Sequence, residues 1–243
     1  MKTLILGGVR EGRELAELLV TAGIPVITSL AGRVNKPARV AGEVRVGGFG
    51  GADGLATWLR AENIGQVVDA THPFAERISA NAVAACRQAG VPLLRIDRPS
   101  WESHPLAATW QWAPSHSAAA RLAAAHERVL LTVGRQSVAP YLELNNIIAR
   151  MVEAPDVEVP GSWTLLLDRG PYTLDSEREL LTTEHISALV TKDSGGALTE
   201  PKLQAAAELG VAVIVVRRAP LPADIPRVTT AAEAAAWLAE HRR

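Results

Sequence analysis

The sequence has only one cysteine, Cys86, and a formal net charge of −1 at pH 7. A single cysteine excludes an internal disulfide framework, a cysteine-based zinc site and an iron–sulfur cluster. Balanced charge gives no reason to expect nucleic acid or an anionic membrane as a partner. Because the chain also lacks an apolar run of membrane-spanning length and a charged leader with a cleavage site, we expect a cytoplasmic protein.

Several common enzyme signatures are also missing. Neither Tyr141 nor Tyr172 is followed four residues later by lysine, so the arrangement of short-chain dehydrogenases is absent. The sequence contains no G-x-S-x-G nucleophile elbow and no G-K-[ST] phosphate loop. The six histidines show no helical metal-ligand spacing, and no metal site is expected.

The 243 residues alternate short apolar runs with segments of helical period, which is typical of an α/β fold with parallel sheets. We expect two Rossmann-like lobes with mainly parallel sheets that face each other across a cleft. The predicted domains are residues 1–98 and 115–243, joined by a linker at 99–114 that contains three of the six tryptophans. Ligands of such sheets bind beyond the carboxyl ends of the strands, where candidate residues should be sought.

The opening segment reads as a strand at residues 3–6, a glycine-rich turn and a helix at 11–22. Gly7 and Gly12 stand where the first and third glycines of a dinucleotide fingerprint belong. The second glycine is displaced, since Gly8 lies one residue early and Val9 takes its place. A plain glycine-rich turn is the alternative. The cofactor-binding candidates here are Gly7, Gly8, Val9, Arg10, Glu11 and Gly12.

The end of the second expected strand lacks the acid that binds the ribose 2′-hydroxyl of NAD, about 20 residues after the glycines. It carries Ser29, Gly32 and Arg33 instead. A serine hydroxyl and a guanidinium can both bind a 2′-phosphate, which favours NADP(H) as the cofactor. The alternative for Arg33 is a solvated loop residue.

Polar residues follow three later apolar segments. Asp69, Thr71 and His72 leave one expected strand and enter a helix, and all three are expected to face the cleft. Lys192 and Asp193 end another strand. Alternatively, His72 caps or packs locally, and Asp193 neutralises Lys192. We expect Thr71, His72 and Lys192 among the cofactor contacts.

Six segments carry the remaining signal: L-G-G-V-R-E-G-R-E-L-A (6–16), S-L-A-G-R (29–33), G-G-F-G-G (47–51), D-A-T-H-P-F-A (69–75), G-P-Y (170–172) and T-K-D-S-G-G (191–196). Taken together, they resemble the precorrin-6A reductase family of cobalamin biosynthesis, and they keep the family's order along nearly the whole chain. The family commonly has threonine where Val9 stands, so backbone N–H groups would have to replace that hydroxyl.

This resemblance implies that the protein uses NADPH to reduce the C18–C19 double bond of precorrin-6A, a tetrapyrrole with many carboxylate arms. In this interpretation residues 1–98 hold NADP(H) and residues 115–243 close over the substrate. We expect the protein to be a monomer and its substrate to be a small molecule. Candidate partners for the carboxylates are Arg77, Arg95, Arg98 and Arg135. Candidates for substrate contact or proton delivery are Asp69, His72, Tyr172, Lys192 and Asp193.

Two other functions fit parts of the sequence. The first is an NADPH-dependent reductase of another acidic small molecule, which shares all the cofactor residues. The second is a non-catalytic NADP(H) sensor, in which residues 69–75 and 191–196 clamp the nucleotide and nothing is reduced.

Overall fold

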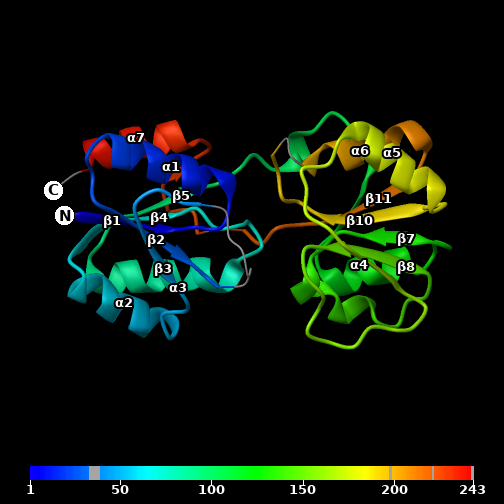
Figure 1. The fold of residues 1–243 in the computed structure, drawn as a ribbon, viewed down its shortest axis with the longest axis horizontal. Coiled ribbons are helices and arrows are strands. Elements are labelled where there is room, and N and C mark those ends of the chain that lie inside the picture. Colours follow the sequence, from blue (N-terminus) through cyan, green and yellow to red (C-terminus); the bar gives the residue numbers. More distant parts are fainter. Residues whose placement is uncertain (33–38, 197–198, 221, 242–243) are drawn as a thin grey trace. The chain divides into compact units, whose positions relative to one another are not determined.

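The computed structural model describes residues 1–32, 39–196, 199–220 and 222–241, which fold into two compact units (Figure 1). The first unit comprises Met1–Arg98 with Ala219–Arg243, and the second comprises Pro99–Arg218. Each unit contains a six-stranded sheet whose neighbouring strands run parallel. The predicted α/β class with two Rossmann-like units is therefore confirmed.

The sheet of the first unit has the strand order β12-β5-β4-β1-β2-β3, so the order reverses between β1 and β4. A reversal of this kind leaves the carboxyl ends of two adjacent strands open to a ligand. The strands are β1 (Lys2–Leu6), β2 (Val26–Leu30), β3 (Glu43–Val46), β4 (Ile64–Asp69), β5 (Leu93–Ile96) and β12 (Arg227–Val228). The helices are α1 (Arg10–Thr21), α2 (Gly51–Ala61), α3 (Glu76–Ala89) and α7 (Ala231–Glu240).

Alternate residues of β1 face opposite sides of this sheet, as the period of a strand requires. Ile5 packs in the core beneath α1 and α7, whereas Leu4 and Leu6 pack in the core of α2 and α3. These two pairs of helices cover opposite faces of the sheet (Figure 1). Burial on both faces explains why three consecutive residues of the strand, Leu4, Ile5 and Leu6, are all apolar rather than alternating with polar ones.

The sheet of the second unit has the order β6-β11-β10-β7-β8-β9, and its order reverses between β7 and β10. Helices α5 and α6 cover one face and α4 the other (Figure 1). The strands are β6 (Gln111–Ala113), β7 (Val129–Leu131), β8 (Ile147–Met151), β9 (Thr164–Leu167), β10 (Ala188–Lys192) and β11 (Ala212–Val216). The helices are α4 (His116–Ala123), α5 (Leu174–Thr183) and α6 (Pro201–Leu209).

The unit boundaries differ from the predicted domains 1–98, 99–114 and 115–243. The tryptophan-rich segment is part of the second unit, because Trp101 and Trp110 are buried in its core and β6 pairs with β11. Residues 219–243 belong to the first unit, where β12 pairs with β5 and α7 packs on α1. Hydrophobic periodicity identifies a strand or a helix but does not reveal which sheet it joins. The sequence therefore could not show that the chain comes back to the first unit at residue 219.

The close approach of α1 to the end of β4 gives a test of the fold. A Cβ on Gly12 would lie 3.1 Å from the Cβ of Ala70. We expect Gly12→Val to destabilise the protein by about 1–3 kcal/mol, because the helix must move away from the strand. Gly48→Ala is the matched control, since a Cβ there meets nothing within 4 Å. Urea unfolding measures both variants, and equal stabilities would contradict the packing role of Gly12.

Candidate functional site

The turn between β1 and α1 lies where the strand order of the first unit reverses. Gly7 allows a tight approach to β2, because a Cβ there would lie 2.8 Å from Thr28 Cγ2. Gly8 has φ +148°, a backbone conformation that other residues rarely adopt. Together with Gly12, these residues produce the turn and the close helix–strand packing that a dinucleotide-binding loop requires.

The N-terminus of α1 has no side-chain cap. Val9 occupies the N-cap position with extended backbone angles, and its side chain is buried in the core rather than bonded to the first turn. The N–H groups of the first turn are therefore not used by an N-cap side chain, and the helix dipole adds partial positive charge there. This arrangement suits a phosphate group.

Two cofactor-binding candidates in the first turn of α1 are engaged in ion pairs. Arg10 Nε donates to Glu14 at 2.6 Å, and Arg98 binds Glu11 with two hydrogen bonds of 2.8 and 2.7 Å. Burial opposes ionisation of Glu11, but the hydrogen bonds from Arg98 and the backbone lower its pKa below the ordinary value. Arg98 thus offsets a negative charge that would otherwise repel a phosphate at this turn.

An arginine that the sequence analysis missed lies beside the end of β2. Arg45 on β3 pairs in register with Ser29, and its Nη1 donates to Ser29 Oγ at 3.2 Å. Its guanidinium also binds the carbonyls of Gly47 and Gly48, and it lies 3.7 Å above the ring of Phe49. Burial lowers the pKa of Arg45. Arg33 lies outside the described residues. Gly32, the last described residue before it, has φ +70°.

Asp69 and Thr71 differ from the expectation that they face a ligand. Asp69 is 2% exposed, and both of its carboxylate oxygens accept hydrogen bonds. Thr71 donates to Oδ1 from its backbone N at 3.0 Å and from its hydroxyl at 2.7 Å, and Ser79 donates to Oδ2 at 2.6 Å. Arg95 Nη1 lies 2.6 Å from Oδ2. These residues form a buried network that fixes the end of β4.

His72 follows this network and is only partly buried. Its Nδ1 accepts a hydrogen bond from the backbone N–H of Phe74 at 3.2 Å. A neutral ring in this arrangement carries its proton on Nε2. The local capping role weighed from the sequence is therefore present, and it leaves the ring with a defined tautomer.

In the second unit, Asp193 follows β10 and is buried among donors. Ser100 Oγ and the Trp101 backbone N–H donate to it at 2.7 and 2.9 Å, and Arg218 binds both of its oxygens. Asp193 therefore holds the end of β10 to the segment before β6.

Lys192 ends β10 next to Gly134, where a Cβ would lie 3.8 Å from the lysine Nζ. Burial lowers the pKa of Lys192 to about 8. A second lysine, Lys202 in the first turn of α6, lies beneath the same strand ends and is 6% exposed. Burial and the nearby Arg150 lower the pKa of Lys202 to about 7, while Glu177 opposes this shift. The sequence analysis missed Lys202, because a lysine in a helix is usually solvated.

Tyr172 lies close to Arg150 and Glu177, the two charged residues that also act on Lys202. Arg150 stacks 3.9 Å from the centre of the Tyr172 ring, and its Nη2 binds Glu177 at 2.8 Å. Burial raises the pKa of Tyr172, although Arg150 opposes the effect. The phenol therefore keeps its proton at neutral pH.

The arginines expected to bind substrate carboxylates have different surroundings. Arg95 is buried with Asp69, Arg98 binds Glu11, and Arg135 binds Asp156 at 2.8 Å. Arg77 at the start of α3 is exposed. Among the described residues, no three or more His, Cys, Asp or Glu side chains gather to hold a metal ion, and no helix is long and apolar enough to span a membrane.

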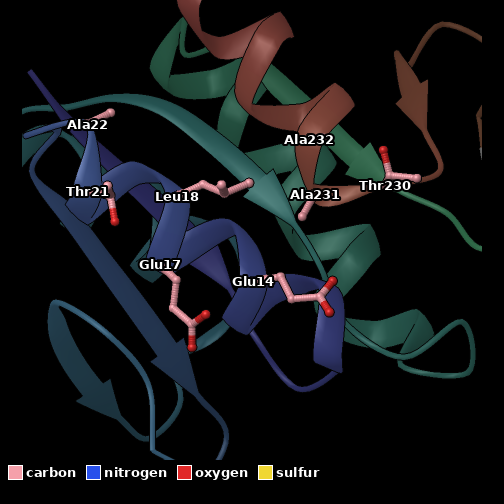
Figure 2. A pocket seen from close by; sticks show the side chains of 8 residues that line it. All are labelled: Glu14, Glu17, Leu18, Thr21, Ala22, Thr230, Ala231 and Ala232. Atoms are coloured by element: carbon pink, nitrogen blue, oxygen red, sulfur yellow. The ribbon is translucent and has the colours of Figure 1, made fainter.

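A surface groove of about 670 Å³ lies between α1 and α7 of the first unit (Figure 2). Its polar side chains include Glu14 and Glu17 on α1, with Thr230 before α7, and none of its lining residues is basic. No basic side chain lines the groove, and Glu14 is already paired with Arg10, so the groove offers no cation to phosphates or a polycarboxylate. The groove is therefore a poor candidate for the ligand site compared with the strand ends.

Comparison with known proteins gives a match over almost the whole chain. A family model described as precorrin-6x reductase CbiJ/CobK matches residues 2–239. The precorrin-6A reductase of Rhodococcus erythropolis is 44% identical over 241 residues, covering 98% of this chain and 97% of the relative. That of Mycobacterium tuberculosis is 44% identical over 242 residues with the same coverage.

A more distant relative and a solved structure agree with these matches. The cobalt-precorrin-6A reductase of Salmonella typhimurium is 31% identical over 232 residues, covering 88% of this chain and 86% of the relative. The solved structure of CobK precorrin-6A reductase superimposes with a TM-score of 0.89 at 37% identity, covering 100% of this chain and 97% of that one.

The buried network around Asp69 predicts a structural effect of mutation. We expect Asp69→Asn to destabilise the protein by about 3–5 kcal/mol, because Arg95 would remain buried without its counter-charge. The control is Asp224→Asn, which breaks the exposed pair with Arg87 and should change stability little. Chemical denaturation measures both. An Asp69→Asn variant of unchanged stability would return Asp69 to the list of catalytic candidates.

Proposed function

The chain belongs to the precorrin-6x reductase family, and on this basis we propose that it reduces precorrin-6A with NADPH in cobalamin biosynthesis. The observation that carries this proposal is the full-length similarity to named precorrin-6A reductases at 44% identity. The phosphate-binding geometry at the end of β1 supports a nucleotide cofactor. The relatives named precorrin-6A reductase that are compared above are 44% identical to this chain, whereas the one named cobalt-precorrin-6A reductase is 31% identical. We therefore propose the metal-free precorrin-6A as the substrate rather than its cobalt form.

The residues of the first unit fit the cofactor at three points. The turn formed by Gly7 and Gly8 and the uncapped first turn of α1 would hold the pyrophosphate. Gly12 permits the helix–strand packing that brings this turn to the strand end. Thr71 and His72, at the end of the adjacent β4, would border the same position, with the buried Thr71 acting through the backbone that it fixes.

Selectivity for NADPH is assigned to the end of β2. The ribose end of a dinucleotide lies at this strand end in Rossmann folds, where an acid selects NAD and an arginine accommodates a 2′-phosphate. Ser29 and Arg45 occupy this position, with Arg33 following in the sequence. The forked donors of Arg45 are suited to phosphate oxygens, and they would exchange part of their present backbone contacts for them.

The reduction adds one hydride and one proton across a carbon–carbon double bond. When bound, NADPH supplies the hydride to one carbon of that bond. The neighbouring carbon takes a proton, and the hydrogen bonds of the candidate side chains support some of them as the donor more than others. Each oxygen of Asp69 and Asp193 already accepts hydrogen bonds from N–H or O–H groups, so we assign both carboxylates to structural networks rather than to proton delivery. His72 and Tyr172 remain as donors, and Lys192 is assigned to binding an anion.

The activity itself is tested by mixing the purified protein with NADPH and precorrin-6A. We expect loss of nicotinamide absorbance together with a matching change in the tetrapyrrole spectrum. Oxidation of NADPH only with a different acidic acceptor would favour the alternative reductase. Tight binding of NADPH and NADP⁺ with equal affinity, and no oxidation with any tetrapyrrole, would favour the sensor.

The role of Arg45 predicts a selective loss of affinity. We expect Arg45→Ala to weaken NADPH binding about tenfold or more while changing NADH affinity less than about threefold, because only NADPH carries the 2′-phosphate. Arg33→Ala tests the second arginine in the same way. Arg87→Ala, which removes an exposed arginine of α3 paired with Asp224, is the control. Fluorescence titration measures all three, and equal losses for both nucleotides would exclude phosphate recognition.

A further inference from the structure

We propose that Phe49 and Trp58 form an aromatic clamp that positions Arg45 for the 2′-phosphate of NADPH, and that this clamp sets the preference for NADP(H) over NAD(H). This role rests on the proposed function, which assigns Arg45 to that phosphate. Phe49 lies in the glycine-rich segment 47–51, one of the six segments that resemble the family. Both aromatic residues act through the arginine, so they are positioning residues rather than ligands of the cofactor.

The guanidinium of Arg45 lies against both aromatic rings. Its central carbon is 3.7 Å from the centre of the Phe49 ring and 5.5 Å from the centre of a Trp58 ring. Both distances are within the range in which a cation is attracted to an aromatic ring. The two rings meet edge to face, with centroids 5.2 Å apart and planes inclined by 65°. Arg45 is therefore held by a pair of rings that also hold each other.

The two rings are anchored to the body of the first unit. Trp58 is part of α2, and both rings are partly buried against the core that lies beneath α2 and α3. The segment that carries Phe49 is tied to the end of β2, because the N–H of Gly47 donates to the carbonyl of Leu30 at 2.9 Å. The clamp therefore connects the Arg45 guanidinium to a fixed part of the fold.

The first turn of α2 also fixes the position of Phe49. A Cβ on Gly54 would overlap the carbonyl oxygen of Phe49, so only glycine permits this approach of the helix to the segment before it. Gly50, which directly follows Phe49, has φ +80°. The glycines of this region therefore specify one close-packed conformation, in which the Phe49 ring is directed to Arg45.

Holding Arg45 in place before the cofactor arrives reduces the cost of binding. An arginine side chain is long and flexible, and fixing it on a phosphate costs conformational entropy. Within the described residues its guanidinium donates to Ser29, Gly47 and Gly48, which leaves two of its five N–H groups for a phosphate even before any backbone bond is exchanged. NADH lacks the 2′-phosphate, so the clamp favours NADPH alone.

The experiment is a double-mutant cycle that measures affinity for NADPH and for NADH. Both nucleotides are titrated by fluorescence into the wild type, Phe49→Leu, Arg45→Ala and the double variant. We expect Phe49→Leu to weaken NADPH binding about threefold to tenfold and NADH binding less than about twofold, because a cation–π contact that holds the arginine is lost. In the Arg45→Ala background the same substitution should change either affinity less than about twofold, because no arginine is left to position.

Three further variants make the result specific. Phe49→Tyr keeps the ring and should retain NADPH affinity within about twofold of the wild type. Trp58→Leu should weaken NADPH binding selectively, as Phe49→Leu does, and it replaces that variant if Phe49→Leu does not fold. Trp237→Leu is the matched control and should change neither affinity. Trp237 is a partly buried aromatic residue of the same unit, but it stacks on His241.

Unchanged NADPH affinity in both Phe49→Leu and Trp58→Leu overturns the clamp and leaves Arg45 as the phosphate ligand. An equal loss of NADPH and NADH, or a loss of the same size in the Arg45→Ala background, also overturns it, because the ring would then act on the fold or on the nucleotide itself. Equal losses in Arg45→Ala overturn both the clamp and the phosphate assignment. If the selective losses are found but the wild type does not oxidise NADPH with precorrin-6A, the clamp stands and the proposed function fails.

Discussion

The structure depends on the reversal of strand order within each parallel sheet. At a reversal the chain leaves the two central strands in opposite directions along the sheet, so the carboxyl ends of these strands are not closed by a connection. In the first unit this applies to β1 and β4, and in the second to β7 and β10. The glycine turn, the Asp69 network and the lysines Lys192 and Lys202 all lie at these ends.

Buried charge has two different uses in this protein. Asp69 with Arg95, and Asp193 with Arg218, are pairs in which the carboxylate is surrounded by donors, and both fix the end of a strand. Such pairs cost much of their attraction in lost solvation, so they specify geometry more than they stabilise the fold. Lys202 is different, because Glu177, the acid that acts on it, is already bound by Arg150. A buried charged group whose polar atoms all have hydrogen-bond partners therefore holds a strand end, whereas one without a counter-charge is suited to binding a ligand.

The sequence predicted the fold class because strands buried on both faces contain runs of consecutive apolar residues and the helices between them are periodic. It also predicted the roles of Gly7 and Gly12, since local spacing determines how close a turn can approach its neighbours. It did not predict the partners of Asp69 or Asp193, because these lie 26 and 25 residues away at Arg95 and Arg218, on strand ends whose pairing is not local. Arg45 was missed for the same reason: its contact with Ser29 follows from the register of β2 and β3.

Lys202 shows why burial must be known before a charged residue can be interpreted. In sequence it is one more lysine in the first turn of a helix, where a cation is even slightly unfavourable to the helix dipole. In the structure its ammonium is enclosed, and burial lowers its pKa to about 7. Between pH 7 and the ordinary lysine pKa of 10.5, the unfolded chain binds a proton at Lys202 that the folded chain does not. This residue therefore favours unfolding at neutral pH. An anion bound beside Lys202 would favour the protonated amine and raise its pKa again. The folded state would then regain the free energy that burial of this lysine costs, which favours an anionic ligand over a neutral one.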